Sequence, residues 1–139
     1  MNVENQVVPS MERLQEFFGP GAPSGAFVMV NMLKFKEKAE YADGRETTLS
    51  GTEAYMAYAA EVVKLVEKHG GRQIYGGVVT GLMLGEVEEL WDMIALVEYP
   101  SNEAFQQMMQ SPEYQEVHVH RDAGLAGQLN IRIQGSAGA

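Results

Sequence analysis

The sequence predicts an α+β domain in which helices cover one face of a four-stranded antiparallel sheet. The first observation behind this prediction is the order of the apolar segments, which have strand and helix lengths in the sequence β, α, β, β, α, β. The second is that the predicted helices begin at recognisable capping residues. The third is the length of 139 residues, which is ordinary for a single domain with its own core.

Charge and composition exclude several classes of function. The formal net charge is −9 and there is no cysteine, which rules out disulfides and thiolate chemistry. An acidic surface repels phosphate groups, so we expect neither a nucleic acid nor an anionic membrane as a partner. Residues 1–9 lack the basic and apolar parts of a signal peptide, and no apolar run approaches the roughly 20 residues that cross a bilayer. We therefore expect a cytoplasmic protein.

Residues 1–25 are predicted to form an arm outside the domain. Ser10 can cap a short helix, because Met11, Leu14, Phe17 and Phe18 follow with helical spacing. The two prolines and three glycines of residues 19–25 then end this helix. We expect the domain to keep its fold when the arm is removed.

The first strand and the segment after it are predicted from residues 26–49. Residues 26–35 read AFVMVNMLKF, a nearly continuous apolar run that suits a central strand covered on both faces. Residues 36–49 are charged and long for a connector, and loops of this kind are often functional. We expect this loop to cover the opening of a ligand site.

The next helix has the clearest pattern in the chain. Ser50 and Glu53 match a capping box, and Gly70 and Gly71 supply the stop. One stripe of apolar side chains lies between them, consisting of Ala54, Tyr55, Tyr58, Val62, Leu65 and Val66.

The remaining elements follow in quick succession. Residues 72–85 are predicted to form a glycine-punctuated strand, and residues 91–99 a further strand that ends at Pro100. Ser101 and Ser111 each begin a helix, the second with the cap, proline and acid order of an N-terminus. Residues 129–133 alternate between apolar and polar and predict a half-buried strand, after which 135–139 form a frayed tail.

This order of elements is the split βαβ pattern of the ferredoxin-like fold, with the domain at residues 26–134. One helical layer can cover only one face of the sheet. The predicted strands nevertheless have apolar side chains on both faces, and a second copy of the chain would cover the free one. We therefore expect a homodimer. The apolar positions are Val28, Val30 and Met32 in one strand and Trp91, Met93, Ala95 and Val97 in the other.

Five spaced motifs together resemble the DUF1330 domain, a family of the dimeric α+β barrel superfamily. The resemblance implies a ferredoxin-like subunit, a sheet-to-sheet dimer and a small cavity in each subunit. Relatives in the superfamily include cofactor-free monooxygenases, small-molecule isomerases and haem-binding enzymes, so the resemblance implies a fold more than a chemistry. The motifs are VNMLKF at 30–35, GTEAY at 51–55, EYPS at 98–101, SPEYQ at 111–115 and HRDAGL at 120–125.

Asn31 is the first candidate for a ligand site, because it is a single amide within an apolar strand. A buried amide without partners costs about 1–3 kcal/mol, so it must be bonded to something. It either bonds to neighbouring backbone or a water molecule, or it points into a pocket and orients a ligand. Tyr58 and Trp91 can line such a pocket, or they can be plain core.

The helix after Ser111 carries the candidate catalytic groups. Tyr114, His118 and Arg121 share one stripe of this helix, whereas His120 projects elsewhere because residues two apart diverge by about 200°. The two histidines therefore cannot chelate one metal, and we expect no metal and no cofactor. Either histidine can be structural, or it can act as a general base.

Arg121 needs an anionic partner if it is partly buried, and the candidates are Glu98, Asp92 or a ligand carboxylate.

Three functions remain open. The first is a cofactor-free enzyme, monooxygenase-like or isomerase-like, that acts on a small apolar substrate with a carbonyl or carboxylate. The second is a non-catalytic ligand-binding or stress-associated module. The third is a purely structural dimer.

Overall fold

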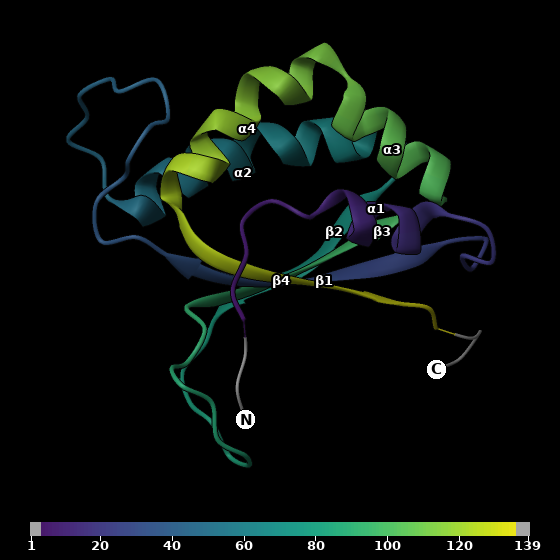
Figure 1. The fold of residues 1–139 in the computed structure, drawn as a ribbon, viewed down its shortest axis with the longest axis horizontal. Helices are drawn as coiled ribbons and strands as arrows, with labels where there is room; N and C mark the ends of the chain where they lie inside the picture. Colours follow the sequence, from purple (N-terminus) through teal and green to yellow (C-terminus); the bar gives the residue numbers. More distant parts are fainter. Residues whose placement is uncertain (1–3, 136–139) are drawn as a thin grey trace.

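The computed structural model describes residues 4–135 and confirms the predicted order of elements (Figure 1). The predicted tail beyond residue 135 lies outside the described residues. The elements are α1 (Met11–Phe18), β1 (Phe27–Phe35), α2 (Gly51–Lys68), β2 (Arg72–Val78), β3 (Met93–Tyr99), α3 (Asn102–Gln110), α4 (Pro112–Gly124) and β4 (Leu125–Ile133).

The four strands form one sheet in the order β2-β3-β1-β4, and every neighbouring pair is antiparallel. Helices α2, α3 and α4 lie together on one face of this sheet, and α1 lies on the same side near its edge (Figure 1). The predicted α+β class and ferredoxin-like arrangement are therefore confirmed. Across residues 4–135, no helix is long and apolar enough to cross a membrane.

β1 and β3 begin within two residues of the predicted start, whereas β2 and β4 differ more from the prediction. β2 ends at Val78 instead of continuing to residue 85, because ladder pairing stops once the Val79 amide has bonded to the Asp92 carbonyl at 3.0 Å. Residues 79–92, which we call the hairpin loop, then leave the sheet on the side away from the helices (Figure 1). β4 begins at Leu125, directly after α4, because Leu125 already pairs with Phe35.

Helices α2 and α4 meet backbone to backbone at two glycines. A Cβ atom placed on Gly124 would lie 2.3 Å from the carbonyl oxygen of Gly51, so neither position has space for a side chain. The predicted capping box is present next to this contact, with Ser50 and Glu53 each satisfying the other's backbone amide. The contact fixes where α4 ends and therefore where β4 starts.

The core lies between the sheet and the helices. Phe27 and Met29 of β1 pack there against Phe105 and Met108 of α3. The arm joins this cluster, because Phe18 of α1 stacks near Phe105 with ring centroids 5.9 Å apart. That residues 26–134 fold without the arm stays a prediction.

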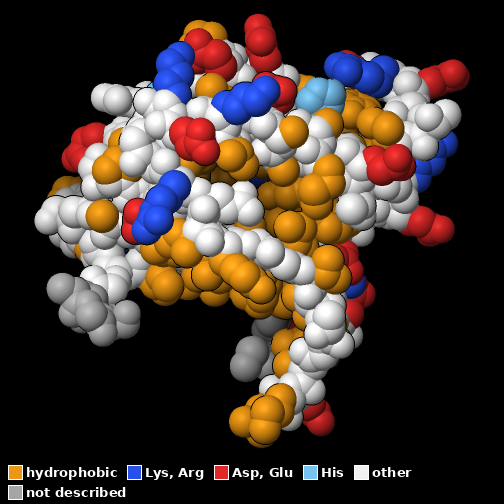
Figure 2. Space-filling view, turned by 180° about the vertical axis from the view of Figure 1, so that it is seen from behind, with side chains coloured by type: hydrophobic (Ala, Val, Ile, Leu, Met, Phe, Trp, Pro, Cys, Tyr) orange, Lys and Arg blue, Asp and Glu red, His pale blue; other side chains and the backbone are white. Residues whose placement is uncertain are grey.

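The opposite face of the sheet is mostly apolar, and no helix within residues 4–135 covers it. Strand register places β1 residues of even number on this open face, together with their partners on β3 and β4. Figure 2 shows hydrophobic side chains along the underside of the molecule, continuing toward the hairpin loop. The open face, as we call it below, consists of Val28, Val30, Met32, Ile94, Leu96, Leu129, Ile131 and Ile133.

Candidate functional site

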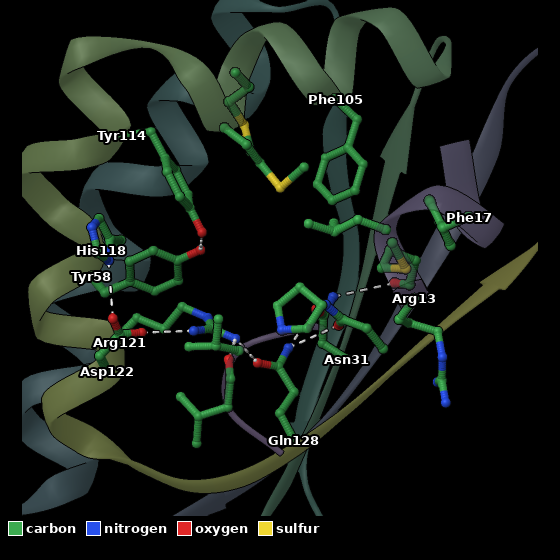
Figure 3. A pocket seen from close by; sticks show the side chains of 18 of the residues that line it. Arg13, Phe17, Asn31, Tyr58, Phe105, Tyr114, His118, Arg121, Asp122 and Gln128 are labelled. Carbon is green, nitrogen blue, oxygen red and sulfur yellow. Dashed lines mark hydrogen bonds and ion pairs between the residues drawn. The ribbon is translucent and has the colours of Figure 1, made fainter. Parts of the chain in front are cut away.

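A cavity of about 360 Å³ lies between the helix-covered face of the sheet, the helices and the arm (Figure 3). Most of its wall is apolar or aromatic, with side chains from β1, α1, α2, α3 and α4. One wall is polar and is formed where α4 meets β4. The apolar and aromatic part includes Leu14, Phe17, Phe18, Met29, Tyr55, Tyr58, Tyr99, Phe105, Met108, Met109 and Tyr114.

Arg121 is the centre of the polar wall, and 14% of its side chain is exposed. Its Nη1 atom donates to Asp122 Oδ1 at 2.8 Å, and its Nη2 atom donates to Gln128 Oε1 at 2.6 Å. Nη2 also donates to the carbonyl oxygen of Val7 at 2.8 Å, which holds the arm against the cavity. These bonds use three of the five N–H groups of a guanidinium. The other two make no hydrogen bond within residues 4–135.

The prediction that Glu98 or Asp92 pairs with Arg121 is wrong. Glu98 lies on the open face beside Val28 and pairs with Arg72 at 3.1 Å. Asp92 lies at the base of the hairpin loop, 3.6 Å from the Lys34 ammonium. The carboxylate that Arg121 meets is its own neighbour in sequence, Asp122.

Asn31 extends the polar wall into the sheet. Its Nδ2 atom donates to the carbonyl of Ala95 at 3.2 Å, and its Oδ1 atom accepts from Gln128 Nε2 at 3.0 Å. Gln128 Nε2 also donates to Asn130 Oδ1 at 2.8 Å. The amide thus bonds to neighbouring backbone, as one alternative predicted, and it also borders the cavity. That Asn31 orients a ligand stays a prediction.

His118 borders the same cavity and forms a pair with Asp122. Its Nδ1 atom lies 3.0 Å from Asp122 Oδ2, one helical turn along α4. A proton on Nδ1 that bonds to this carboxylate leaves Nε2 with a free lone pair. Within the described part of the chain, Nε2 makes no hydrogen bond. Asp122 thus joins His118 to Arg121 across its two oxygens (Figure 3).

Two tyrosines cross the cavity above the polar wall. The hydroxyl oxygens of Tyr58 and Tyr114 lie 3.3 Å apart, and Figure 3 shows the two rings pointing toward one another. Burial raises the pKa of Tyr58 well above its ordinary value, and it raises the pKa of Tyr55 to about 12. These phenols therefore stay neutral and can donate hydrogen bonds at any pH near neutrality.

Two of the predicted site residues lie elsewhere. His120 points to the other side of α4, where its Nδ1 atom lies 2.7 Å from the hydroxyl of Tyr41. Trp91 precedes β3 and lines a separate hollow with Phe35 and Met56. Five predicted residues are brought together at the cavity, namely Asn31, Tyr58, Tyr114, His118 and Arg121.

The prediction that the loop at residues 36–49 covers the site is wrong. Ala39 and Tyr41 of this loop are buried against Ala54 and Ala123, where α2 begins and α4 ends. The arm covers the cavity instead, with lining residues from Val7 to Phe18. The helical spacing of apolar residues in the arm could have predicted this contact, because a short helix with an apolar stripe has to pack against the domain.

Gln128 and Asp122 also border the cavity, although neither is among the predicted site residues. The last strand alternates as predicted, and strand register shows that its polar residues face the helices. Gln128, Asn130 and Arg132 therefore point into the core side, whereas Ile131 and Ile133 lie on the open face. Polar residues at every second position of this strand could have predicted the polar wall, because polar side chains that face a core must bond to one another or to a ligand.

The described residues contain no group of three or more His, Asp and Glu side chains that could hold a metal ion. Besides tyrosines, the ionisable groups that line the cavity are His118, Arg121 and Asp122 of α4 and Arg13 of α1. This set can bind an anion or a carbonyl oxygen and can move a proton.

The order of elements, the antiparallel sheet and the single helical layer define a ferredoxin-like α+β protein with an internal cavity. The chain belongs to the family described as Domain of unknown function (DUF1330), whose model matches residues 41–133. No curated protein matches the chain. The predicted family is thereby confirmed.

Solved structures show the same fold. The RPA0582 protein of unknown function from Rhodopseudomonas palustris is 28% identical, with a TM-score of 0.84 over 96% of this chain and 98% of that chain. The methylated RPA0582 protein is 32% identical, with a TM-score of 0.85 over 95% and 96% of the two chains. A protein from Bacteroides fragilis, described as dimeric, of unknown function and ferredoxin-like, is 10% identical with a TM-score of 0.53 over 79% and 96%.

We predict that three buried tyrosines ionise only when the protein unfolds at alkaline pH. The raised pKa of Tyr55, Tyr58 and Tyr99 means that folding favours their neutral form. This contribution to stability is complete below the unfolded pKa near 10 and is lost as the pH rises through about 12. Phenolate absorbance should therefore show these three tyrosines ionising only with alkaline unfolding.

The variant Tyr58→Phe assigns this step, because it should lose one ionisation from it. Ionisation of Tyr55, Tyr58 and Tyr99 before circular dichroism shows unfolding would contradict the burial of the cavity wall.

Proposed function

We propose that the cavity binds a small, largely apolar molecule with a carbonyl or carboxylate group, and that His118 transfers a proton to or from this molecule without a cofactor. The observation that carries the proposal is the division of the cavity wall. Aromatic and aliphatic side chains form most of it, while Arg121, Gln128 and Asn31 form one bonded polar surface. Ligand pockets commonly combine an apolar body with a few convergent polar groups.

The polar wall supports recognition of an oxygen acceptor. The side chain of Arg121 is held in place by three bonds and still has two N–H groups without a protein acceptor in the described chain. Charge-assisted bonds from a guanidinium to a carboxylate are stronger than bonds between neutral groups. A ligand oxygen at this wall would therefore be oriented by Arg121, with its apolar body against the aromatic side chains.

The His118–Asp122 pair supports the proton transfer. A carboxylate at Nδ1 fixes the ring orientation and stabilises the charge that forms when Nε2 takes a proton. His120 lacks this role in our proposal, because its ring lies beside Tyr41 and outside the cavity wall. A reaction of this kind removes a proton from carbon next to the ligand carbonyl and returns it elsewhere, as in an isomerisation.

We also propose that the chain is a homodimer in which two open faces pack against each other. The Bacteroides fragilis protein of similar fold is described as dimeric. The open face of this chain is apolar from β4 to β3, and burial of such a surface stabilises association. The cytoplasmic location stays a prediction.

We predict that Asn31→Leu weakens ligand binding and keeps the fold. The leucine is close in volume to asparagine, so the fold should be kept. It cannot accept the hydrogen bond from Gln128, however, so the polar groups around a ligand oxygen would no longer be held in place. Thermal-shift and calorimetric titrations with phenylacetate should show at least a tenfold loss of affinity, which corresponds to about 1–3 kcal/mol for an unpaired polar group.

The matched control is Gln107→Leu, which replaces an exposed amide on α3 outside the cavity wall and should bind phenylacetate as the wild type does. The neutral probe 2-phenylethanol should bind more weakly than phenylacetate to the wild type. Equal affinity for the two probes, or equal loss in both variants, would contradict the assignment of the polar wall.

We predict that His118→Asn abolishes proton exchange without abolishing binding. Phenylpyruvate has a carboxylate, a ketone and an exchangeable CH₂ group, so its deuteration in D₂O can be followed by proton NMR. The wild type should exceed the buffer rate and the variant should not. Binding of phenylpyruvate with no acceleration by the wild type would favour the non-catalytic ligand-binding alternative.

We predict a mass of about twice 15.3 kDa by light scattering at micromolar concentration. Val30→Asp should give the monomer, because it places an unpaired charge in the centre of the open face. Ala57→Asp, on the exposed side of α2, should remain dimeric. A monomeric wild type would show that another partner, or none, covers this face.

A further inference from the structure

The hairpin loop presents bulky apolar side chains to solvent. At its tip, Met83 is 96% exposed and Leu84 is 82% exposed, with Leu82 next to them at 49%. Neither α3 nor α4 contributes to the surroundings of this tip, because the loop leaves the sheet on the side away from the helices (Figure 1). Exposed apolar clusters of this kind mark interaction surfaces in soluble proteins.

The base of the hairpin loop is firmly attached to β1. Lys34 Nζ donates to the carbonyl of Leu90 at 2.8 Å and lies 3.1 Å from Glu89 Oε1. Asp92 bonds to β1 twice, from its amide to the Leu33 carbonyl at 2.8 Å and through Oδ2 to the Phe35 amide at 2.8 Å. The base of the projection is thus fixed relative to β1.

The loop and the open face form one continuous apolar surface. Hydrophobic side chains on the underside of the molecule lead to the projecting loop (Figure 2). Tyr75 of β2 is 70% exposed and pairs with Leu96 of the open face, so it extends this face along the strand that leads into the loop. The hairpin loop projects at an angle from the open face. A molecule that packs on the open face therefore also contacts the side of the loop.

Charge argues against two kinds of partner for this surface. Glu86 and Glu89 follow the tip closely, and the chain as a whole carries a net charge of −9. Nucleic acids and anionic membranes are disfavoured by this field. A second copy fits the geometry, because in a two-fold arrangement each copy supplies both a projecting loop and an apolar face to the other.

We propose that the tip of the hairpin loop, Leu82 to Leu84, packs against the second copy of this chain and clasps the sheet-to-sheet dimer from both sides. This inference rests on the proposed homodimer and adds a second, peripheral contact to it. The loop is then an element of assembly, and the cavity on the other face of the sheet remains accessible in the dimer.

The test is the dimer dissociation constant of the full-length chain, measured by sedimentation velocity over a dilution series. The double variant Met83→Ser, Leu84→Ser should raise the Kd at least about tenfold, because two large apolar side chains leave the interface. The control Met11→Ser replaces a methionine on α1 that is 72% exposed and should leave the Kd unchanged.

Three outcomes separate the two proposals. A tenfold or larger rise for the tip variant alone supports the clasp. An unchanged Kd in the tip variant, with dissociation caused by Val30→Asp, overturns the clasp and leaves the sheet-to-sheet dimer intact. A wild type that is monomeric at all concentrations overturns both.

A second measurement does not depend on the serine variants. The chain has no cysteine, so Met83→Cys and Met11→Cys each supply a single thiol for maleimide labelling. Labelling at position 83 should slow at least severalfold above the Kd relative to below it, whereas labelling at position 11 should not change. Equal rates at position 83 in monomer and dimer would overturn the clasp.

Discussion

The structure of the site depends on one largely buried cation. The Arg121 guanidinium cannot lose a proton and cannot leave water without acceptors. Its acceptors come from three parts of the chain, namely Asp122 on α4, Gln128 on β4 and the Val7 carbonyl in the arm. Satisfying this one group therefore fixes the angle between α4 and β4 and holds the arm over the cavity.

The cavity follows from this arrangement together with a second constraint. The backbone contact of Gly51 with Gly124 brings α2 and α4 together at one end of the helical layer. Toward the other end, aromatic side chains such as Tyr58 and Phe105 meet the sheet, and the space between them is bordered by the arm. The result is an apolar chamber with a polar wall whose groups are already bonded to one another. Preorganised polar groups in an apolar setting are what a selective site for a carbonyl or carboxylate requires.

Much of the fold could be predicted from local sequence signals, and part of the site could as well. Caps, apolar stripes and strand-length runs specify helices and strands because they act within a few residues. Asn31 and Arg121 were recognisable because each is polar in an apolar pattern. The partners of Arg121 were not, since Glu98 and Asp92 are equally plausible until the fold places Glu98 on the open face and Asp92 beside Lys34. The arm and Gln128 depend on contacts between distant segments, which no local pattern contains.

The central claim is that the polar wall of the cavity recognises a ligand oxygen. The most direct measurement is an NMR titration of ¹⁵N-labelled protein with phenylacetate, which reports on the side-chain amides of Asn31 and Gln128 and on the Nε–H group of Arg121. The account predicts that these three signals shift together with one affinity, while the side-chain amide of Gln107 on the exposed side of α3 stays unchanged. Shifts confined to the hairpin loop or the open face, or no shift at the three polar-wall groups at millimolar phenylacetate, would contradict it.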